Sequence, residues 1–336
     1  MDSLTHIAVG ACIGEAMAGK VLGRKALLWG MLLHSLPDID FLAGLWLSET
    51  NNLLAHRGIT HSLLFLILVT PIIAAFASWL HAAHALGFKR WLAFFYIAVG
   101  AHIFIDTFNN YGVGLLEPFS NLRFSFNTMY VADPFFTIGP LVAMFALILL
   151  RKRNPSRRKW WAWGIGLAMA YTVYAVAHKL QINRDVKKSL AEQRIPYNDY
   201  FSTPAPFQSW LWFVVVKEDT TFKVGYRSVF DKQKLLSWRT LSRNDALLDS
   251  FPDQDAVQQL KSFSQGYYSG ELYGDTVVLN DFRFGQEIGW QDSLGKIAFH
   301  YYLNYPDQNS LVVQRGRFAR WDKEVFRQYL RRIAGN

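Results

Sequence analysis

The sequence predicts a membrane α-helical bundle of about six transmembrane helices, followed by a soluble α+β C-terminal domain. One supporting observation is composition: 51% of the 336 residues are hydrophobic and 16% are aromatic, yet mean hydropathy is only +0.08. The other is order, because apolar runs fill the chain up to about residue 178 and a mixed sequence follows. We therefore expect a transmembrane metal-site domain over residues 1–180 and an extracytoplasmic domain over 181–336.

Six apolar runs approach the length of about 17–25 residues that a helix needs to cross a bilayer. The first is short and rich in Gly and Ala, so it could instead lie buried inside the bundle. The second is interrupted by the polar sequence HSLPDID. The six runs cover residues 4–19, 26–47, 62–80, 91–108, 135–150 and 160–178.

Basic residues are distributed unequally among the loops between these runs. Loops 20–25, 81–90 and 151–159 contain eleven Lys and Arg, whereas loops 48–61 and 109–134 contain two. Because cytoplasmic loops are enriched in Lys and Arg, the first set should be cytoplasmic. The other loops and everything after residue 178 are then external. In a bacterium this predicts an inner membrane protein with a periplasmic C-terminal domain. The same bias accounts for much of the net charge of +9, so we expect no nucleic-acid partner.

The C-terminal half has the composition of a mixed α+β domain. Segments 210–216, 221–230, 275–284 and 297–305 are rich in β-branched and aromatic residues and are bounded by Gly, Pro, Asn and Asp, which predicts strands. Segment 242–265 predicts one or two helices, and segment 321–334 predicts an amphipathic helix with a basic face. The role of this domain is open: a cap over the external site, or a module that recruits substrate.

Histidine and aspartate residues recur at the predicted external ends of the N-terminal runs. The topology was set from the basic residues alone, so this agreement is an independent check. Ionisable groups inside membrane spans are costly and mark functional sites. The candidates are His6, His34, Asp38, Asp40, His56, His61, His102 and Asp106.

The spacing of these residues predicts how they meet. His102 and Asp106 are four apart and share one face of a helix. His34 and Asp38 have the same spacing, but Pro37 should break the helix. We expect the break to turn Asp38 and Asp40 into a cavity from an extended segment.

The sequence HRGITHS (56–62) carries two further histidines. His56 and His61 are five apart and cannot share one helical face closely. Gly58 suggests a turn, with His61 at or near the start of the next helix and Thr60 as its candidate N-cap.

Imidazole and carboxylate ligands without cysteine suit zinc, manganese or iron, and the single Cys12 excludes a cysteine-based site. We expect a divalent metal, zinc or manganese, with one or two ions. A two-metal site suits phosphoester hydrolysis by a metal-activated water. Arg57 would bind a substrate phosphate. We assign catalytic roles to Asp40, Arg57 and His61.

These motifs resemble the YdjM-type family of membrane-bound metal-dependent hydrolases. The resemblance covers residues 1–150 and rests on the N-terminal His, LPDID (36–40), HRGITHS (56–62) and HIFID (102–106). Segment 109–134 is also similar to the family. The resemblance implies a site made of His6, Asp38, Asp40, His56, His61, His102 and Asp106, with Asn109, Glu117 and Asp133 as weaker candidates.

Three functions remain open from the sequence. The leading one is hydrolysis of a phosphoester, of a small-molecule or lipid-linked substrate, by an enzyme that also contacts membrane lipids. The second is an intramembrane zinc protease or amidase, which the absence of HExxH disfavours. The third is a non-enzymatic metal-binding transporter, sensor or assembly factor. No inverted repeat of broken helices is visible to support a transporter.

Overall fold

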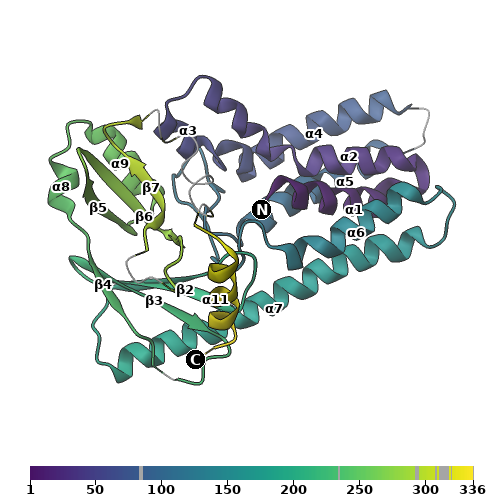
Figure 1. The fold of residues 1–336 in the computed structure, drawn as a ribbon. Helices are drawn as coiled ribbons and strands as arrows, with labels where there is room; N and C mark the ends of the chain where they lie inside the picture. The colour runs from purple at the N-terminus through teal and green to yellow at the C-terminus, as the bar shows by residue number, and fades with distance from the viewer. Residues whose placement is uncertain are drawn as a thin grey trace. The chain divides into compact units, whose positions relative to one another are not determined.

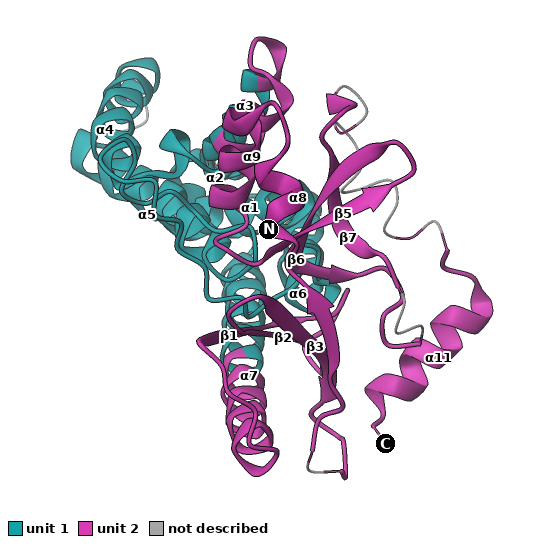
Figure 2. Ribbon diagram, turned by 90° about the vertical axis from the view of Figure 1, so that its left-hand side faces the viewer, with its two compact units in different colours: residues 1–43, 55–175 teal, residues 44–54, 176–336 magenta. Residues whose placement is uncertain are grey.

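The computed structural model describes residues 1–82, 86–233, 235–291, 295–306, 309, 318 and 320–335. The chain divides into two compact units, which Figure 2 distinguishes by colour. Unit 1 contains Met1–Ala43 and Ala55–Ala175, and unit 2 contains Gly44–Leu54 and Val176–Asn336. The boundary at residue 175 falls inside one long helix, α7 (Arg157–Glu192).

Unit 1 is helical (Figure 1). Its first helix, α1, contacts α2, α5 and α6, and 13 of its 20 residues are buried. This is the buried position that its Gly- and Ala-rich composition allowed. The elements of unit 1, besides the first part of α7, are α1 (Ser3–Leu22), α2 (Arg24–His34), the first part of the 3₁₀ helix η1 (Pro37–Leu45), the 3₁₀ helix η2 (Ile59–His61), α4 (Leu63–Leu80), α5 (Phe88–Asp106) and α6 (Pro134–Leu149).

Two described helices, α4 and α5, are long and apolar enough to cross a membrane. The pair formed by α2 and η1 makes a third span if its 55° bend is counted within one crossing. The prediction of about six spans is therefore confirmed only in part. The remaining apolar runs do form helices, but α6 has only 16 residues, about 24 Å. The 36-residue α7 carries a polar second half.

Three glycines let the first two helices approach each other closely. A Cβ atom on Gly30 would lie 2.0 Å from the Gly10 carbonyl oxygen, and one on Gly14 would lie 2.1 Å from the Ala26 carbonyl oxygen. Small residues of this kind allow membrane helices to pack backbone against backbone. A Cβ on Gly10 would also lie 2.7 Å from the Cβ of His34. The glycine contact therefore fixes the distance between the histidine-bearing ends of α1 and α2.

Replacing Gly30 by alanine is expected to destabilise unit 1 by about 1–3 kcal/mol, because the added methyl group overpacks a backbone contact. The change should appear as a lower melting temperature of the purified protein in detergent. Gly166→Ala is the matched control, since a Cβ there meets nothing within 4 Å and alanine favours a helix. An unchanged melting temperature for Gly30→Ala would contradict this account of the helix contact.

Unit 2 contains two antiparallel sheets. The first has the strand order β1-β2-β3-β4 and the second β5-β6-β7. The four strands expected from the sequence are confirmed as β2, β3, β6 and β7, and segment 242–265 forms two helices. The bounds are β1 (Asp199–Pro204), β2 (Leu211–Lys217), β3 (Thr221–Ser228), β4 (Arg239–Ser242), β5 (Tyr268–Tyr273), β6 (Thr276–Gln286) and β7 (Ile297–Tyr302), with α3 (Glu49–Ala55), α8 (Asp245–Asp249), α9 (Gln254–Phe263) and α11 (Lys323–Ile333).

The central strand β2 is buried on both faces. Phe213 and Val215 pack into a core shared with Phe282 of the second sheet. Alternate residues of β2 point the other way, and Trp212 and Val214 pack against the second half of α7. A strand covered on both faces is apolar throughout, which explains the run WLWFVVV. It also explains why α7 continues past residue 178, since its second half covers the first sheet.

Candidate metal centre

The break after α2 positions the first carboxylates. The helix ends at His34, and η1 begins at Pro37, whose ring is accepted at a helix start. The predicted break is present, but Asp38 and Asp40 lie on a 3₁₀ helix rather than on an extended segment. With three residues per turn, residues two apart face different directions. Asp38 therefore faces His61 and His102, whereas Asp40 faces His56 and Arg57.

The HRGITHS segment makes a tight turn before α4. Arg57 has a positive φ of 59°, and its backbone N–H donates to Asp40 Oδ2 at 2.6 Å, so the carboxylate holds the turn. His61 is the last residue of η2. The N-cap of α4 is Ser62, whose side chain accepts from the Phe65 N–H, and not Thr60. The hydroxyl of Thr60 lies 3.1 Å from His61 Nδ1 instead.

Four side chains from three elements converge on one point. His61 Nε2 lies 3.6 Å from Asp38 Oδ1 and 3.6 Å from Asp106 Oδ2. His102 Nε2 lies 3.6 Å from Asp38 Oδ1 and 3.7 Å from Asp106 Oδ2. The two imidazole nitrogens are 3.1 Å apart. We call these four residues the quartet. His61, His102 and Asp106 are fully buried, and the side chain of Asp38 is 24% exposed.

The quartet has the dimensions of a tetrahedral metal site. Zinc bonds of about 2.0–2.2 Å place the ligand atoms of a tetrahedron about 3.3–3.6 Å apart. Five of the six separations run from 3.1 to 3.7 Å, and the sixth, between Asp38 and Asp106, is no more than 4.8 Å. Two imidazole nitrogens and two carboxylate oxygens form a donor set that suits zinc or manganese. The residues therefore fit a divalent ion.

The ring nitrogens that face away from the quartet have partners that fix the tautomers. His102 Nδ1 donates to the carbonyl oxygen of His34, which leaves Nε2 unprotonated, with its lone pair directed into the site. His61 Nδ1 lies 3.5 Å from Asp40 Oδ2. Metal-binding histidines commonly use a carbonyl or a carboxylate in this way. Asp40 is thus placed behind His61, where it orients the ring, and not among the quartet.

His6 and His34 form a second group with His102 next to the quartet. The His6 and His102 rings stack with centroids 3.8 Å apart, and His6 Nε2 lies 3.1 Å from Asp106 Oδ1. His34 Nδ1 donates to the Ala98 carbonyl at 2.7 Å. The other ring nitrogens, His6 Nδ1 and His34 Nε2, are buried without a hydrogen-bond partner among the described residues. Such orphaned buried atoms fit a site for a bound ion or an ordered water.

Asp106 is the most highly connected carboxylate of the centre. Its Oδ1 contacts the Met1 main-chain nitrogen and His6, and its Oδ2 lies 3.1 Å from Arg57 Nε. The guanidinium of Arg57 also donates to Asn109 Oδ1 at 2.5 Å and is only 2% exposed. These contacts engage Arg57 within the protein, so it balances the charge of Asp106.

The remaining candidates lie around this centre. His56 is 39% exposed and contacts Asp40 Oδ1 at 3.2 Å, outside both histidine groups. Asn109 anchors Arg57. Asp133 caps α6 and accepts from the Tyr171 hydroxyl at 2.7 Å, so it serves the helix. Arg123 was not identified from the sequence, although its position as one of two external basic residues was a signal. It donates to the His56 carbonyl at 2.9 Å.

Glu117 returns to the centre from the loop after α5. Its carboxylate lies against two glycines: a Cβ on Gly58 would be 2.7 Å from Oε2, and one on Gly114 would be 2.5 Å from Oε1. Arg123 Nη2 lies 3.9 Å from Oε1. Burial raises the pKa of Glu117 above its usual value, while the charge of Arg123 partly opposes this. Glu117 is therefore a partly buried carboxylate packed beside the HRGITHS turn.

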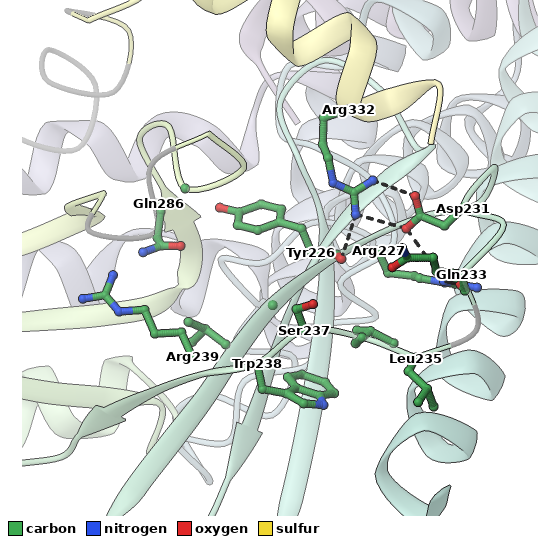
Figure 3. Close-up of a pocket in the computed structure, with 14 residues that line it drawn as sticks. Tyr226, Arg227, Asp231, Gln233, Leu235, Ser237, Trp238, Arg239, Gln286 and Arg332 are labelled. Carbon is green, nitrogen blue, oxygen red and sulfur yellow. Dashed lines mark hydrogen bonds and ion pairs between the residues drawn. The ribbon is translucent and has the colours of Figure 1, made fainter. Parts of the chain in front are cut away.

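Unit 2 has a cavity of its own, of about 270 Å³, shown in Figure 3. Three of its four charged side chains, those other than Arg239, are paired in ion pairs. Arg332 binds Asp231 at 2.7 Å, and Arg227 binds Asp185 at 2.9 Å. Among the described residues, the groups of His and Asp that could hold a metal lie in unit 1. The candidate centre is therefore the one in the helical unit.

Comparisons with known proteins agree with these motifs. A family model described as "YdjM inner membrane protein" matches residues 1–182. The chain is 36% identical over 125 residues to Inner membrane protein YbcI of Escherichia coli, covering 36% of this chain and 69% of that protein. It is 32% identical over 154 residues to Uncharacterized protein YfhP of Bacillus subtilis, covering 43% of this chain and 45% of that protein. No solved structure gives a significant match.

Proposed function

We propose that this chain, which belongs to the YdjM family of inner membrane proteins, is a membrane-bound, metal-dependent hydrolase of phosphoesters. The observation that carries the proposal is the quartet of Asp38, His61, His102 and Asp106, whose ligand atoms have tetrahedral separations. Of these residues only Asp38 is partly exposed. The centre is thus open on the Asp38 side, where a substrate could enter.

A divalent ion, zinc or manganese, held by the quartet would supply Lewis-acid activation of water and of a phosphoryl group. The protein residues have separate tasks in this proposal. Asp40 orients His61, and Arg57 neutralises Asp106 so that the buried centre carries less net negative charge. His6 and His34 offer two further nitrogens beside the quartet, which provides for a second ion.

Glu117 is the proposed proton-transfer group. A carboxyl whose pKa is raised by burial is closer to the operating pH and transfers protons more effectively. The two glycines leave room for its carboxylate against the HRGITHS turn. As a general base, Glu117 would accept the proton of the attacking water in its ionised form.

Glu117→Gln is expected to lower kcat by about 10²–10⁴-fold, the usual contribution of a general base, while metal content stays unchanged. In the parent protein the rate should rise with pH through the raised pKa of Glu117, because the base must be ionised. The variant should lose this limb of the pH profile. A variant profile that keeps the limb would assign it to another group.

A lipid-linked substrate is favoured by apolar side chains exposed around the centre. Phe119 is 82% exposed, Leu122 59% and Phe126 54%, all on the loop that carries Glu117 and Arg123. Phe41, on η1 beside Asp40, is 71% exposed. Exposed apolar groups of this kind mark membrane contact sites. They would hold the opening of the centre at the level of the lipid headgroups.

The proposal is tested with the full chain in lipid nanodiscs, loaded with zinc or manganese. Substrates are a vesicle phospholipid, soluble bis(p-nitrophenyl) phosphate and an unstructured peptide. We expect hydrolysis of both phosphodiesters, faster for the lipid, and no reaction in Asp38→Asn. Peptide cleavage without phosphodiester turnover would favour the protease alternative. Bound metal without turnover of any substrate would favour a non-enzymatic role.

A further inference from the structure

Unit 1 has a cavity at the opposite end of α1 from the metal centre. It has a volume of about 750 Å³ and is lined by the end of α1, the 152–155 loop and the start of α7. His6 and Lys20 are 14 residues apart on α1, so about 21 Å of helix separates the two sites. Its volume falls within the range of about 300–1,000 Å³ that is typical of small-molecule sites.

The lining of this cavity is strongly basic. Five cationic residues and a single carboxylate, Glu15, face it. The charge of Glu15 is paired with Arg157 in a bidentate contact, in which Nε and Nη2 donate at 2.8 and 2.6 Å. The cations outside this pair are Lys20, Lys152, Arg153 and Arg158.

The floor of the cavity is rigidly built. Arg157 is 3% exposed, and its Nη1 donates to the carbonyls of Leu147 and Leu150 at 2.6 and 2.7 Å. Lys152 donates to the Val21 carbonyl at 2.7 Å. The loop and the ends of three helices are thereby held in place. The first turn of α7 also faces the cavity, and the N-terminus of a helix favours an anion.

The bias of basic residues toward one membrane side explains their number here but not their arrangement. Orientation depends on how many Lys and Arg lie in the loops, and it requires neither a cavity nor a buried ion pair beneath it. In this structure the cations line a single hollow together with the aromatic Trp161. Leu149, which precedes the residue whose carbonyl accepts from Arg157, is 78% exposed.

We propose that this cavity binds the phosphate headgroup of an anionic phospholipid, such as phosphatidylglycerol or cardiolipin. Basic pockets between membrane helices on the cytoplasmic side bind such headgroups. The cations provide charge complementarity to the phosphate, and Trp161 in the lining and the exposed Leu149 provide apolar surface for the acyl chains. A soluble phosphate would use the cations but would gain nothing from these apolar side chains. This inference stands independently of the proposed hydrolase activity.

The test uses the full chain purified in neutral detergent and measures its melting temperature against added ligand. The ligands are phosphatidylglycerol, cardiolipin, phosphatidylcholine and inorganic phosphate. The site variant is Lys152→Gln with Arg153→Gln and Arg158→Gln. The matched control is Lys25→Gln with Lys89→Gln and Arg90→Gln, which removes equal charge from exposed positions outside the cavity.

We expect the anionic lipids to raise the melting temperature of the parent protein, while phosphatidylcholine and inorganic phosphate do not. The site variant should bind the anionic lipids at least about tenfold more weakly, since each cation near a lipid surface contributes about fivefold. The control should change by less than about twofold. Equal losses of lipid affinity in both variants would show that general surface charge, and not this cavity, attracts the lipid. An equal rise in melting temperature with inorganic phosphate would show that the cavity does not select a phospholipid.

Discussion

Replacing His61 and Asp106 together by alanine is expected to abolish metal binding and all hydrolytic activity. The double change removes two of the four quartet atoms and leaves Asp38 and His102, too few to define a tetrahedral site. Metal content measured by mass spectrometry on the purified chain should fall from at least one ion per chain to background. Loss of a single orienting residue, as in Asp40→Asn, should weaken metal affinity by about 10–100-fold.

The control for this prediction is His56→Ala. His56 belongs to the same motif as His61, but its side chain is 39% exposed and lies outside both histidine groups. Its removal should leave the metal content close to that of the parent protein. Asp106→Ala also leaves the buried guanidinium of Arg57 without its counter-charge, which could itself destabilise the protein. Asp38→Ala is therefore the complementary variant. It removes a ligand from a partly exposed position, and it should lose metal while the protein stays folded. Full metal content in the double variant would refute the site.

Residue spacing predicted the parts of the centre that depend on local geometry. His102 and Asp106 meet because they are four apart on one helix, and the break at Pro37 follows from the proline ring. The placement of Asp40 did not follow in the same way, because the prediction assumed an extended segment. In the 3₁₀ helix that forms, Asp38 and Asp40 face different directions, which separates the quartet residue from the one that orients His61.

Long-range pairings were not predictable from a single sequence. Glu117, which the family resemblance suggested only as a weaker candidate, packs against the HRGITHS turn from a loop about 60 residues later, and no spacing pattern links the two segments. The stretch Gly44–Leu54 groups with unit 2, although it lies within the N-terminal third of the chain. Here Tyr301 donates to the Glu49 carbonyl at 3.5 Å. Such contacts depend on tertiary packing, which local composition does not encode.

Replacing Glu15 by alanine is expected to destabilise unit 1 by about 3–5 kcal/mol, more than any other single substitution considered. Glu15 and its ion-pair partner Arg157, which are 142 residues apart in the sequence, are 8% and 3% exposed. Removing Glu15 leaves the guanidinium of Arg157 buried without a counter-charge, which is the costly way to break a buried ion pair. The melting temperature in detergent should drop sharply. The loss should be nearly independent of salt, because buried pairs are poorly screened.

The double variant Glu15→Ala with Arg157→Met separates the charge from the packing. It removes both ions, so the penalty for an unpaired charge disappears and the protein should be more stable than Glu15→Ala alone. Recovery should remain incomplete, because Arg157 also donates to the carbonyls of Leu147 and Leu150 at the end of α6. A double variant less stable than Glu15→Ala would show that these carbonyl contacts, and not the ion pair, are the main contribution of Arg157. Arg157 would then serve mainly to cap the end of α6 rather than to neutralise Glu15.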